Sequence, residues 1–251
     1  MLKVKLRGSQ LVKALIVLIF VSPFIYGPAA RMHSFYWSHR FSRYQPVAES
    51  QVPELERFHF LDLSVCANAD YHHNAFLPNP NSGGDHFPEL QPGIYLSGDK
   101  VPFRVLESFS VTDKPSVITT GEDAYFSCRM LLLARPSQAL HLALDGAWID
   151  RRGSRIARIE VQYQDKTVMG KILVTREDVW TYQEKPSKAH IPKHLVLWEG
   201  IQGHKIVTVS VPLDGNKIPE AVELWTMPAV GKEGKQPAVA IFSVTQEFEG
   251  R

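Results

Sequence analysis

The sequence predicts an all-β protein, folded as a two-sheet antiparallel sandwich, and three observations lead to that class. Short runs in which apolar and polar residues alternate recur from position 58 almost to the end of the chain. Gly, Pro, Asn and Asp bound these runs, while Val, Ile, Phe, Tyr and Thr fill them. No long amphipathic helix lies between them. Many short strands at close spacing are typical of an antiparallel sandwich, whereas a parallel sheet needs alternating helices.

The expected strands begin with FHFLDLSV at 58–65 and are clearest in HKIVTVSVPL at 204–213. In the latter run every second residue from 207 to 211 is valine, which places the valines on one face of a strand. We therefore expect a single sandwich domain over 58–248. Its strands, in chain order, are 58–65, 93–98, 101–106, 115–120, 124–134, 138–145, 154–164, 167–174, 194–200, 204–213, 221–228 and 238–247.

The composition narrows the possible functions. A chain of 251 residues that is 44% hydrophobic has enough apolar surface for a packed core, which excludes disorder over most of its length. Two cysteines are too few for a disulfide-dense scaffold. Four of the 28 basic residues, and none of the 26 acidic ones, lie in the first 30 positions, so the remainder is slightly acidic. We therefore expect no nucleic-acid partner.

The amino end, residues 1–30, has the pattern of an export segment. Four basic residues accompany the apolar run ALIVLIFVSPFIY at 14–26, and small residues follow it. The run is shorter than the roughly 20 residues of a membrane span. It therefore predicts either a cleaved signal peptide or an uncleaved amino-terminal anchor. In both cases the protein is extracytoplasmic, periplasmic or secreted, and any contact with the membrane is made by this segment alone. The polar, aromatic stretch 31–57 is expected to be a spacer.

Cys66 and Cys128 stand in or beside apolar alternation, and an exported chain permits them to pair. A bridge would close a loop of about 60 residues and stabilise the fold by roughly 4 kcal/mol in the loop-entropy model. The alternative is two buried thiols that pack as small hydrophobes. Both readings stay open at the level of sequence.

A long insertion, 67–92, interrupts the strand pattern with four Pro, two Gly and three His. A loop of this length within a compact domain is often functional. Imidazole and carboxylate groups suit zinc or another borderline metal, and four such residues of the loop are candidate ligands: His72, His73, Asp85 and His86. Their spacing matches no known metal motif, and the alternative is a solvated polar loop.

Several segments share their order and motifs with one family. They are LDLSVCAN (61–68), HFPELQPG (86–93), VPFRVL (101–106), RIEVQYQDKTVMGKILVTREDVWTY (158–182), VTVSVPLDGNKIPEAVELWT (207–226) and AIFSVTQE (240–247). Together they resemble a family of bacterial galactose-binding-like β-sandwich domains, of the kind that serve as carbohydrate-binding modules. The resemblance spans nearly the whole body and implies a jelly-roll sandwich. The pair Asp99-Lys100 departs from it, since the family usually has Gly before Val-Pro-Phe.

The resemblance also bears on cofactors and ligands. Jelly-roll sandwiches of this type often hold a structural calcium ion, and oxygen ligands of the right type here are Asp62, Asn68, Asp70 and Glu247. No other cofactor is predicted. Domains of this family are commonly attached to polysaccharide-degrading enzymes, which implies a carbohydrate or another surface polymer as the partner. Oligomeric state cannot be predicted.

Sugar recognition needs aromatic faces for stacking and polar groups at their rim. Trp148 in DGAWIDRR combines both, because Asp145, Asp150 and Arg151 surround it; core burial of this Trp is the alternative. Tyr71 and Phe87 in the 67–92 loop are further candidates. The remaining tryptophans of the body stand in strand-like alternation and are expected to lie in the core: Trp180, Trp198 and Trp225.

These observations favour an exported, non-catalytic β-sandwich that binds carbohydrate or a cell-surface polymer. Two alternatives stay open: an extracytoplasmic protein-interaction or structural domain, and a carboxylate-dependent glycan hydrolase or lyase. The sequence has no nucleophile elbow, no zinc-protease motif and no phosphate loop. Catalysis therefore has no positive support in the sequence, although carboxylate enzymes leave no local motif.

Overall fold

A computed structural model describes residues 44–73, 75–77, 87–121, 126–149, 152–180, 191–200, 204–229 and 235–250. The predicted export segment and residues 31–43 of the predicted spacer lie outside this range. Within the described part of the chain, no helix is long and apolar enough to cross a membrane.

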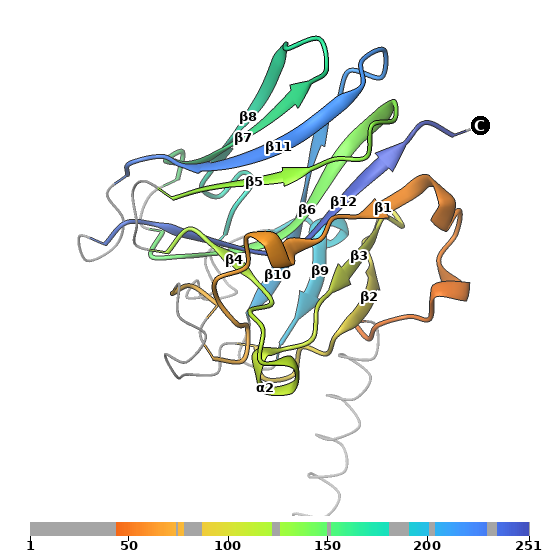
Figure 1. Cartoon of the computed structure of the whole chain (residues 1–251). Helices are drawn as coiled ribbons and strands as arrows, with labels where there is room; N and C mark the ends of the chain where they lie inside the picture. The colour runs from red at the N-terminus through yellow and green to blue at the C-terminus, as the bar shows by residue number, and fades with distance from the viewer. Residues whose placement is uncertain are drawn as a thin grey trace, which may run out of the picture. The chain divides into compact units, whose positions relative to one another are not determined.

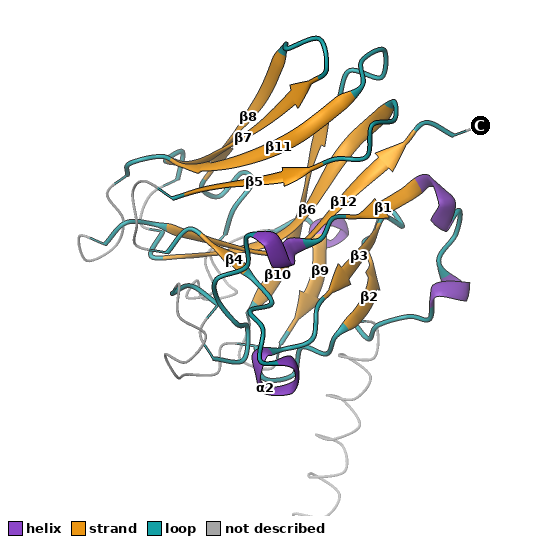
Figure 2. Ribbon diagram, in the orientation of Figure 1, coloured by secondary structure: helices purple, strands orange, loops and turns teal. Residues whose placement is uncertain are grey.

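Two antiparallel sheets face each other and confirm the all-β sandwich (Figures 1 and 2). The six-stranded sheet has the order β1-β12-β6-β10-β9, and β4 also pairs with β12. The four-stranded sheet has the order β5-β11-β7-β8, and a separate hairpin is formed by β2 and β3. The bounds are β1 Phe58–Phe60, β2 Gly93–Leu96, β3 Pro102–Val105, β4 Ile118–Thr119, β5 Ser127–Leu131, β6 Ser137–Ala147, β7 Arg155–Tyr163, β8 Val168–Val174, β9 Val196–Glu199, β10 Lys205–Pro212, β11 Pro219–Thr226 and β12 Ala238–Phe248.

Helical structure among the described residues is confined to short turns. The longest is α2, Phe109–Thr112, and the others are the 3-10 turns η1 (Glu49–Gln51), η2 (Leu55–Arg57), η3 (Leu63–Val65) and η4 (Lys193–Leu195). The chain passes repeatedly from one sheet to the other, for example at β4–β5, β5–β6 and β6–β7. Such crossing is typical of jelly-roll sandwiches.

The core lies between the two sheets. Strand alternation turns one set of side chains inward from each sheet, as with Val207, Val209 and Val211 of β10 and Ile159 and Val161 of β7. The valine stripe expected from the sequence is therefore found in the core. Trp180 and Trp198 are also buried, as expected.

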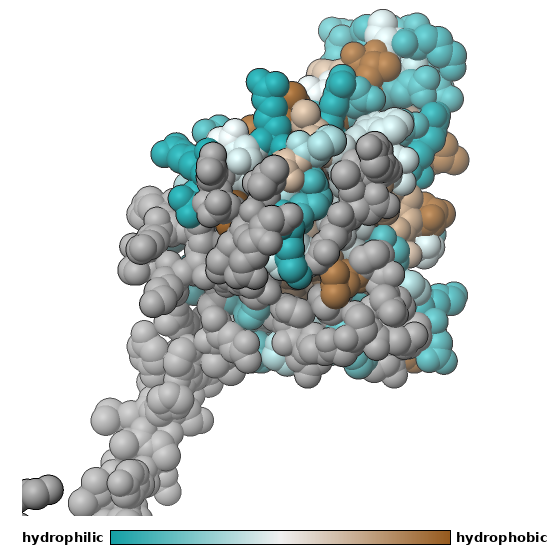
Figure 3. All heavy atoms as spheres, turned by 90° about the vertical axis from the view of Figure 1, so that its left-hand side faces the viewer, coloured by the Kyte–Doolittle hydropathy of each residue, from teal (hydrophilic) through white to brown (hydrophobic). Residues whose placement is uncertain are grey.

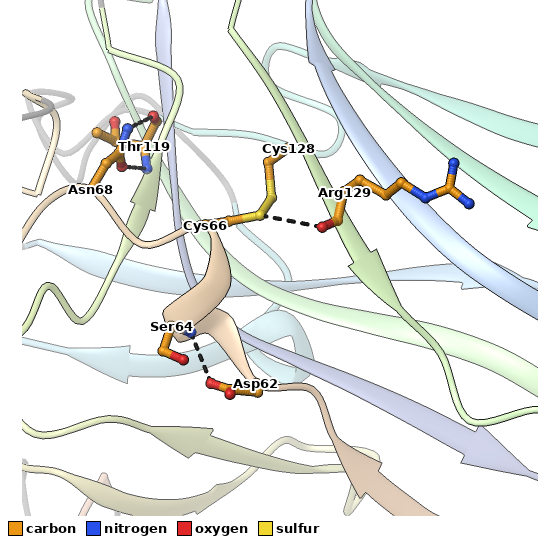
Figure 4. Close-up of a disulfide and its surroundings, with 7 residues drawn as sticks. All are labelled: Asp62, Ser64, Cys66, Asn68, Thr119, Cys128 and Arg129. Carbon is orange, nitrogen blue, oxygen red and sulfur yellow. Dashed lines mark hydrogen bonds between the residues drawn. A yellow bond between two sulfur atoms is a disulfide. The ribbon is translucent and has the colours of Figure 1, made fainter.

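A disulfide joins Cys66, which follows η3, to Cys128 in β5 (Figure 4). The two Cα atoms are 5.8 Å apart, within the range that a disulfide spans. The Cys66 sulfur also lies 3.6 Å from the carbonyl oxygen of Arg129; a disulfide sulfur carries no hydrogen, so this is a packing contact. The bridge holds the segment after β1, a strand of the six-stranded sheet, against the edge strand of the other sheet.

The described part of the predicted spacer is folded onto the domain. Val47 forms a backbone bridge with Ile94 of β2, and its N–H donates to the Ile94 carbonyl at 2.7 Å. Tyr44 and Val52 are buried. The compact unit therefore begins at Tyr44 rather than at residue 58. The apolar side chains of this stretch pack against the domain, although they are too few to show a periodic pattern in the sequence.

Candidate binding face

Trp225 lies on β11, an inner strand of the four-stranded sheet, and points away from the core. Its indole is 41% exposed, while its neighbour Leu224 is buried in the core. The pairing places Trp225 opposite Ser127 of β5 and opposite Arg158 of β7. The expectation that Trp225 is a core residue is therefore wrong. The signal was present, because Glu223 lies two positions earlier and shares its side of the strand.

Two ion pairs lie beside Trp225 on the same face. Arg158 of β7 contacts Glu160 at 2.5 Å, and Arg129 of β5 contacts Glu223 of β11 at 3.1 Å. Glu223 is the direct cross-strand partner of both Arg129 and Glu160, and these three form one row next to Trp225. Arg158 stands opposite Trp225 and reaches that row through its ion pair with Glu160. The face thus has guanidinium donors and carboxylate acceptors next to an aromatic surface.

Gly170 of β8 keeps one end of this row flat. It is the cross-strand partner of Glu160. A Cβ at this position would lie 3.3 Å from Nε of Arg158 and 3.3 Å from the carbonyl oxygen of Ile159. The Arg158 guanidinium therefore lies across Gly170, where a larger residue would crowd it.

The row of residues beyond Glu223, centred on Ala221, is partly apolar. Ala221 of β11 stands opposite Leu131 of β5 and Gln162 of β7, and Gln162 stands opposite Val168 of β8. Leu131 is 75% exposed and Val168 is 55% exposed. Hydrophobic residues appear as separate brown patches among hydrophilic ones in the view of Figure 3, and single exposed apolar residues are common on protein surfaces. Leu131 and Val168, however, lie on the same sheet face as the exposed Trp225.

The loop aromatics that were expected to stack on a ligand are instead buried. Tyr71 and Phe87 have no exposed surface. The Phe87 ring lies 4.9 Å from that of Phe242 in β12 and 5.7 Å from that of Trp198 in β9. The described part of the loop therefore covers the outer side of the six-stranded sheet. The sequence shows that the loop is polar, but it does not show that a sheet with apolar side chains lies beneath the loop's aromatic residues.

The expected Trp148 cluster is only partly assembled among the described residues. Trp148 is half-buried with a positive φ of 55°, its ring 6.5 Å from that of Phe76, and the ammonium of Lys235 lies 4.7 Å from the ring centroid. Its expected partners Asp150 and Arg151 lie outside the described residues. Asp145 is buried, which removes it from any surface site.

Asp145 is unusual among the carboxylates. Its Oδ1 accepts a hydrogen bond from the backbone N–H of Gly146 at 2.7 Å, and its Oδ2 has no partner among the described residues. Burial raises the pKa of this carboxyl well above its ordinary value, against a smaller opposing effect of the hydrogen bond. The side chain therefore keeps its proton to a higher pH than an ordinary Asp does.

Two of the four expected metal ligands, His72 and His73, lie among the described residues, where no group of three or more candidate ligands is found, and the metal site stays a prediction. Nε2 of His72 is 3.3 Å from the carbonyl oxygen of Leu90, and its backbone N–H donates to Asp70. His73 is half-buried, and Asp85 and His86 lie outside the described residues.

The four expected calcium ligands each have protein partners. Asp62 caps η3, and Asn68 exchanges two hydrogen bonds with the backbone of Thr119 (Figure 4). Asp70 is buried and accepts a hydroxyl hydrogen bond, while Glu247 is shared by an arginine and a histidine. These contacts account for the positions of all four side chains, and structural calcium stays a prediction.

A polar cleft of about 670 Å³ lies where η2 meets the carboxyl end. Arg57, which lines it, forms ion pairs with Glu54 at 2.6 Å and with Glu247 at 2.7 Å. Its lining residues are Glu54, Glu56, Arg57, Arg135, Glu249 and Gly250. No aromatic ring lines this cleft, so it lacks the platform that sugar stacking requires.

No protein-family model and no curated protein matches the sequence. Among solved structures, the chain is similar to one reported as a structural analysis of an exo-beta-agarase, at 13% sequence identity and a TM-score of 0.28. The match covers 80% of this chain and 24% of that chain, so the protein spans about a quarter of the enzyme's length. A similarity this low does not transfer a fold or an activity.

Proposed function

We propose that the protein binds carbohydrate on the outer face of its four-stranded sheet, with Trp225 as the stacking platform. The observation that carries this proposal is the 41% exposure of Trp225 on an inner strand, next to two ion pairs. This face replaces the 67–92 loop and Trp148, which the sequence favoured.

The chemistry of the face matches the surface of a sugar. A pyranose ring has apolar C–H faces, which pack against an indole, and hydroxyl groups at its edge, which need donors and acceptors. Arg158, Arg129, Glu160 and Glu223 offer both kinds of group beside the ring. The site is an open sheet rather than a cleft around its carboxylates, so binding is better supported than glycan hydrolysis.

A second candidate is recognition of a protein partner by the same face. Leu131, 75% exposed on the edge strand β5, favours this candidate because exposed apolar residues on a sheet edge are frequent contact points. The two candidates differ in the residue that they depend on: Trp225 for sugar, and Leu131 with Val168 for a protein.

Export is also a proposal. The basic and apolar pattern of residues 1–30 supports it, and so does the Cys66–Cys128 disulfide, because disulfides persist mainly in oxidising compartments. Cell fractionation tests it: the domain should be recovered in the periplasm, in the medium or on the outer side of the membrane, and recovery in the cytoplasmic fraction alone would contradict export.

A glycan array tests the main proposal. The full-length protein should bind a subset of glycans, and Trp225→Ala should lose that binding. Val168→Ala is the matched control, because it removes an apolar side chain from the same face and should bind as the unaltered protein does. Binding that is equal in Trp225→Ala and in the unaltered protein would contradict the proposal. A full array without signal, together with a protein captured only when Leu131 is intact, would favour the second candidate.

A further inference from the structure

A line of polar side chains crosses four neighbouring strands on the outer side of the six-stranded sheet. His141 of β6 lies between Ser210 of β10 and Glu247 of β12: its Nδ1 is 2.8 Å from Oγ of Ser210, and its Nε2 is 2.9 Å from Oε2 of Glu247. Arg57, next to β1, donates to Oε1 of Glu247 at 2.7 Å. The strands β1, β12, β6 and β10 lie side by side in that order, which brings together residues distant in the sequence (Figure 1).

The hydrogen bonds assign the tautomer of His141. A carboxylate can only accept, so Nε2 carries the hydrogen and donates it to Glu247. Nδ1 then has a free lone pair and accepts the Ser210 hydroxyl hydrogen. Burial lowers the pKa of His141, against opposing effects of Glu247 and of Asp99 in the β2–β3 turn. The imidazole is therefore neutral at pH 7 and able to take a proton.

Ser210 is exposed although its histidine is buried. In an antiparallel pair of strands, hydrogen-bonded residue pairs alternate with non-hydrogen-bonded ones. The N–H of Leu213 donates to the carbonyl of Gln138, so the pair Ser210–His141, three positions away, is a non-hydrogen-bonded one. The backbone N–H of Ser210 therefore points away from β6. Strand β9 pairs with β10 only at residues 205–207. Among the described strands, none therefore pairs with the backbone N–H of Ser210, and this donor lies beside the hydroxyl.

We propose that Ser210 is the nucleophile of an acyl-transfer site for small carboxylic esters, with His141 as general base and Glu247 as the carboxylate that orients it. The arrangement contains the nucleophile, the base and the orienting group that such chemistry requires. Arg57 positions Glu247 through the second carboxylate oxygen. The inference does not depend on carbohydrate binding, since it concerns the other sheet.

In the first step Oγ of Ser210 attacks the ester carbonyl carbon while Nδ1 of His141 takes the hydroxyl proton. The bond to the alcohol oxygen breaks, and the alcohol leaves with that proton. In the second step His141 takes a proton from water, the resulting hydroxide attacks the acyl-serine, and the carboxylic acid leaves as Ser210 regains its proton. The N–H of Ser210 is the backbone donor that this proposal assigns to the oxyanion.

The test uses p-nitrophenyl acetate and a fluorophosphonate with the full-length protein, read by released nitrophenol and by intact-protein mass. One label per chain should form, on Ser210, and Ser210→Ala should abolish it. Ser127→Ala is the matched control: it removes an exposed strand serine from the other sheet, away from His141, and labelling should be unchanged. Labelling that is as fast in Ser210→Ala as in the unaltered protein would overturn the proposal.

The role of His141 has its own measurement. His141→Gln should slow acylation by about 10²-fold or more, the usual contribution of a general base. The rate of the unaltered protein should rise with pH through a pKa below 6.5, and this rise should vanish in the variant. A pH profile that is the same in both proteins would overturn the assignment. If His141→Gln fails to fold, Ser210→Ala decides alone, since Ser210 is exposed.

Discussion

The two sheets of the sandwich differ in what covers their outer sides. In β6 and β12 nearly every residue is buried, whichever way it points, whereas β5 and β7 alternate between buried and exposed positions. The six-stranded sheet is covered by loop aromatics such as Phe87 and by the β2–β3 hairpin, where Pro102 accepts a hydrogen bond from Thr245. Within the described residues, the four-stranded sheet keeps Trp225 exposed.

For the aromatic residues, this difference separates those that stabilise the fold from those that a ligand can reach. On the covered side, aromatic rings are structural, and their loss should unfold the protein. On the bare side, an exposed Trp contributes little to folding and is available for binding. The predictions below test this separation, from the largest expected change in stability to the smallest.

Phe87→Ala should destabilise the protein by about 3–5 kcal/mol, the usual cost of removing a buried Phe. The ring fills the space against Phe242 and Trp198, and the surrounding residues cannot close the cavity. Denaturant unfolding measures the change. Phe87→Leu is the matched control and should cost less. A loss below 1 kcal/mol for Phe87→Ala would show that the loop does not cover the sheet.

The double substitution Cys66→Ala and Cys128→Ala should cost about 4 kcal/mol by the loop-entropy model, since the bridge closes a loop across 62 positions. Reduction of the unaltered protein should give a similar loss in thermal unfolding, and reduction should not change the double variant. Equal melting temperatures for the reduced and oxidised protein would contradict a structural role of the bridge.

Asp145→Asn should stabilise the protein at neutral pH. Because the pKa of Asp145 is raised, the folded state holds a proton that the unfolded state releases, so stability falls as pH rises above about 4. The amide stays neutral and keeps the acceptor for Gly146. We expect a gain of about 1–3 kcal/mol at pH 7 and almost none at pH 3. A gain that does not change with pH would contradict the assignment.

The strands and the core could be predicted from the sequence because their signal is local. The run 204–213 and the strand β10 nearly coincide, since alternation is a property of consecutive residues. The residues of the two candidate sites could not be predicted in the same way. Alternation placed Trp225 and Glu223 on one side of a strand, but only the second sheet decides which side is covered. The contacts of His141 join residues 69 and 106 positions apart, for which no local pattern exists.

The most direct test of the account compares Trp225→Ala with Trp148→Ala on a glycan that the protein binds, by calorimetric titration and thermal unfolding. Trp225→Ala should weaken binding roughly five- to hundredfold, equivalent to about 1–3 kcal/mol, with a change in stability within about 0.5 kcal/mol. Trp148→Ala should keep the affinity and lower the melting temperature, because Phe76 and Lys235 pack against its ring. Unchanged affinity in Trp225→Ala, with binding lost in Trp148→Ala, would contradict the assignment of the bare sheet as the binding face.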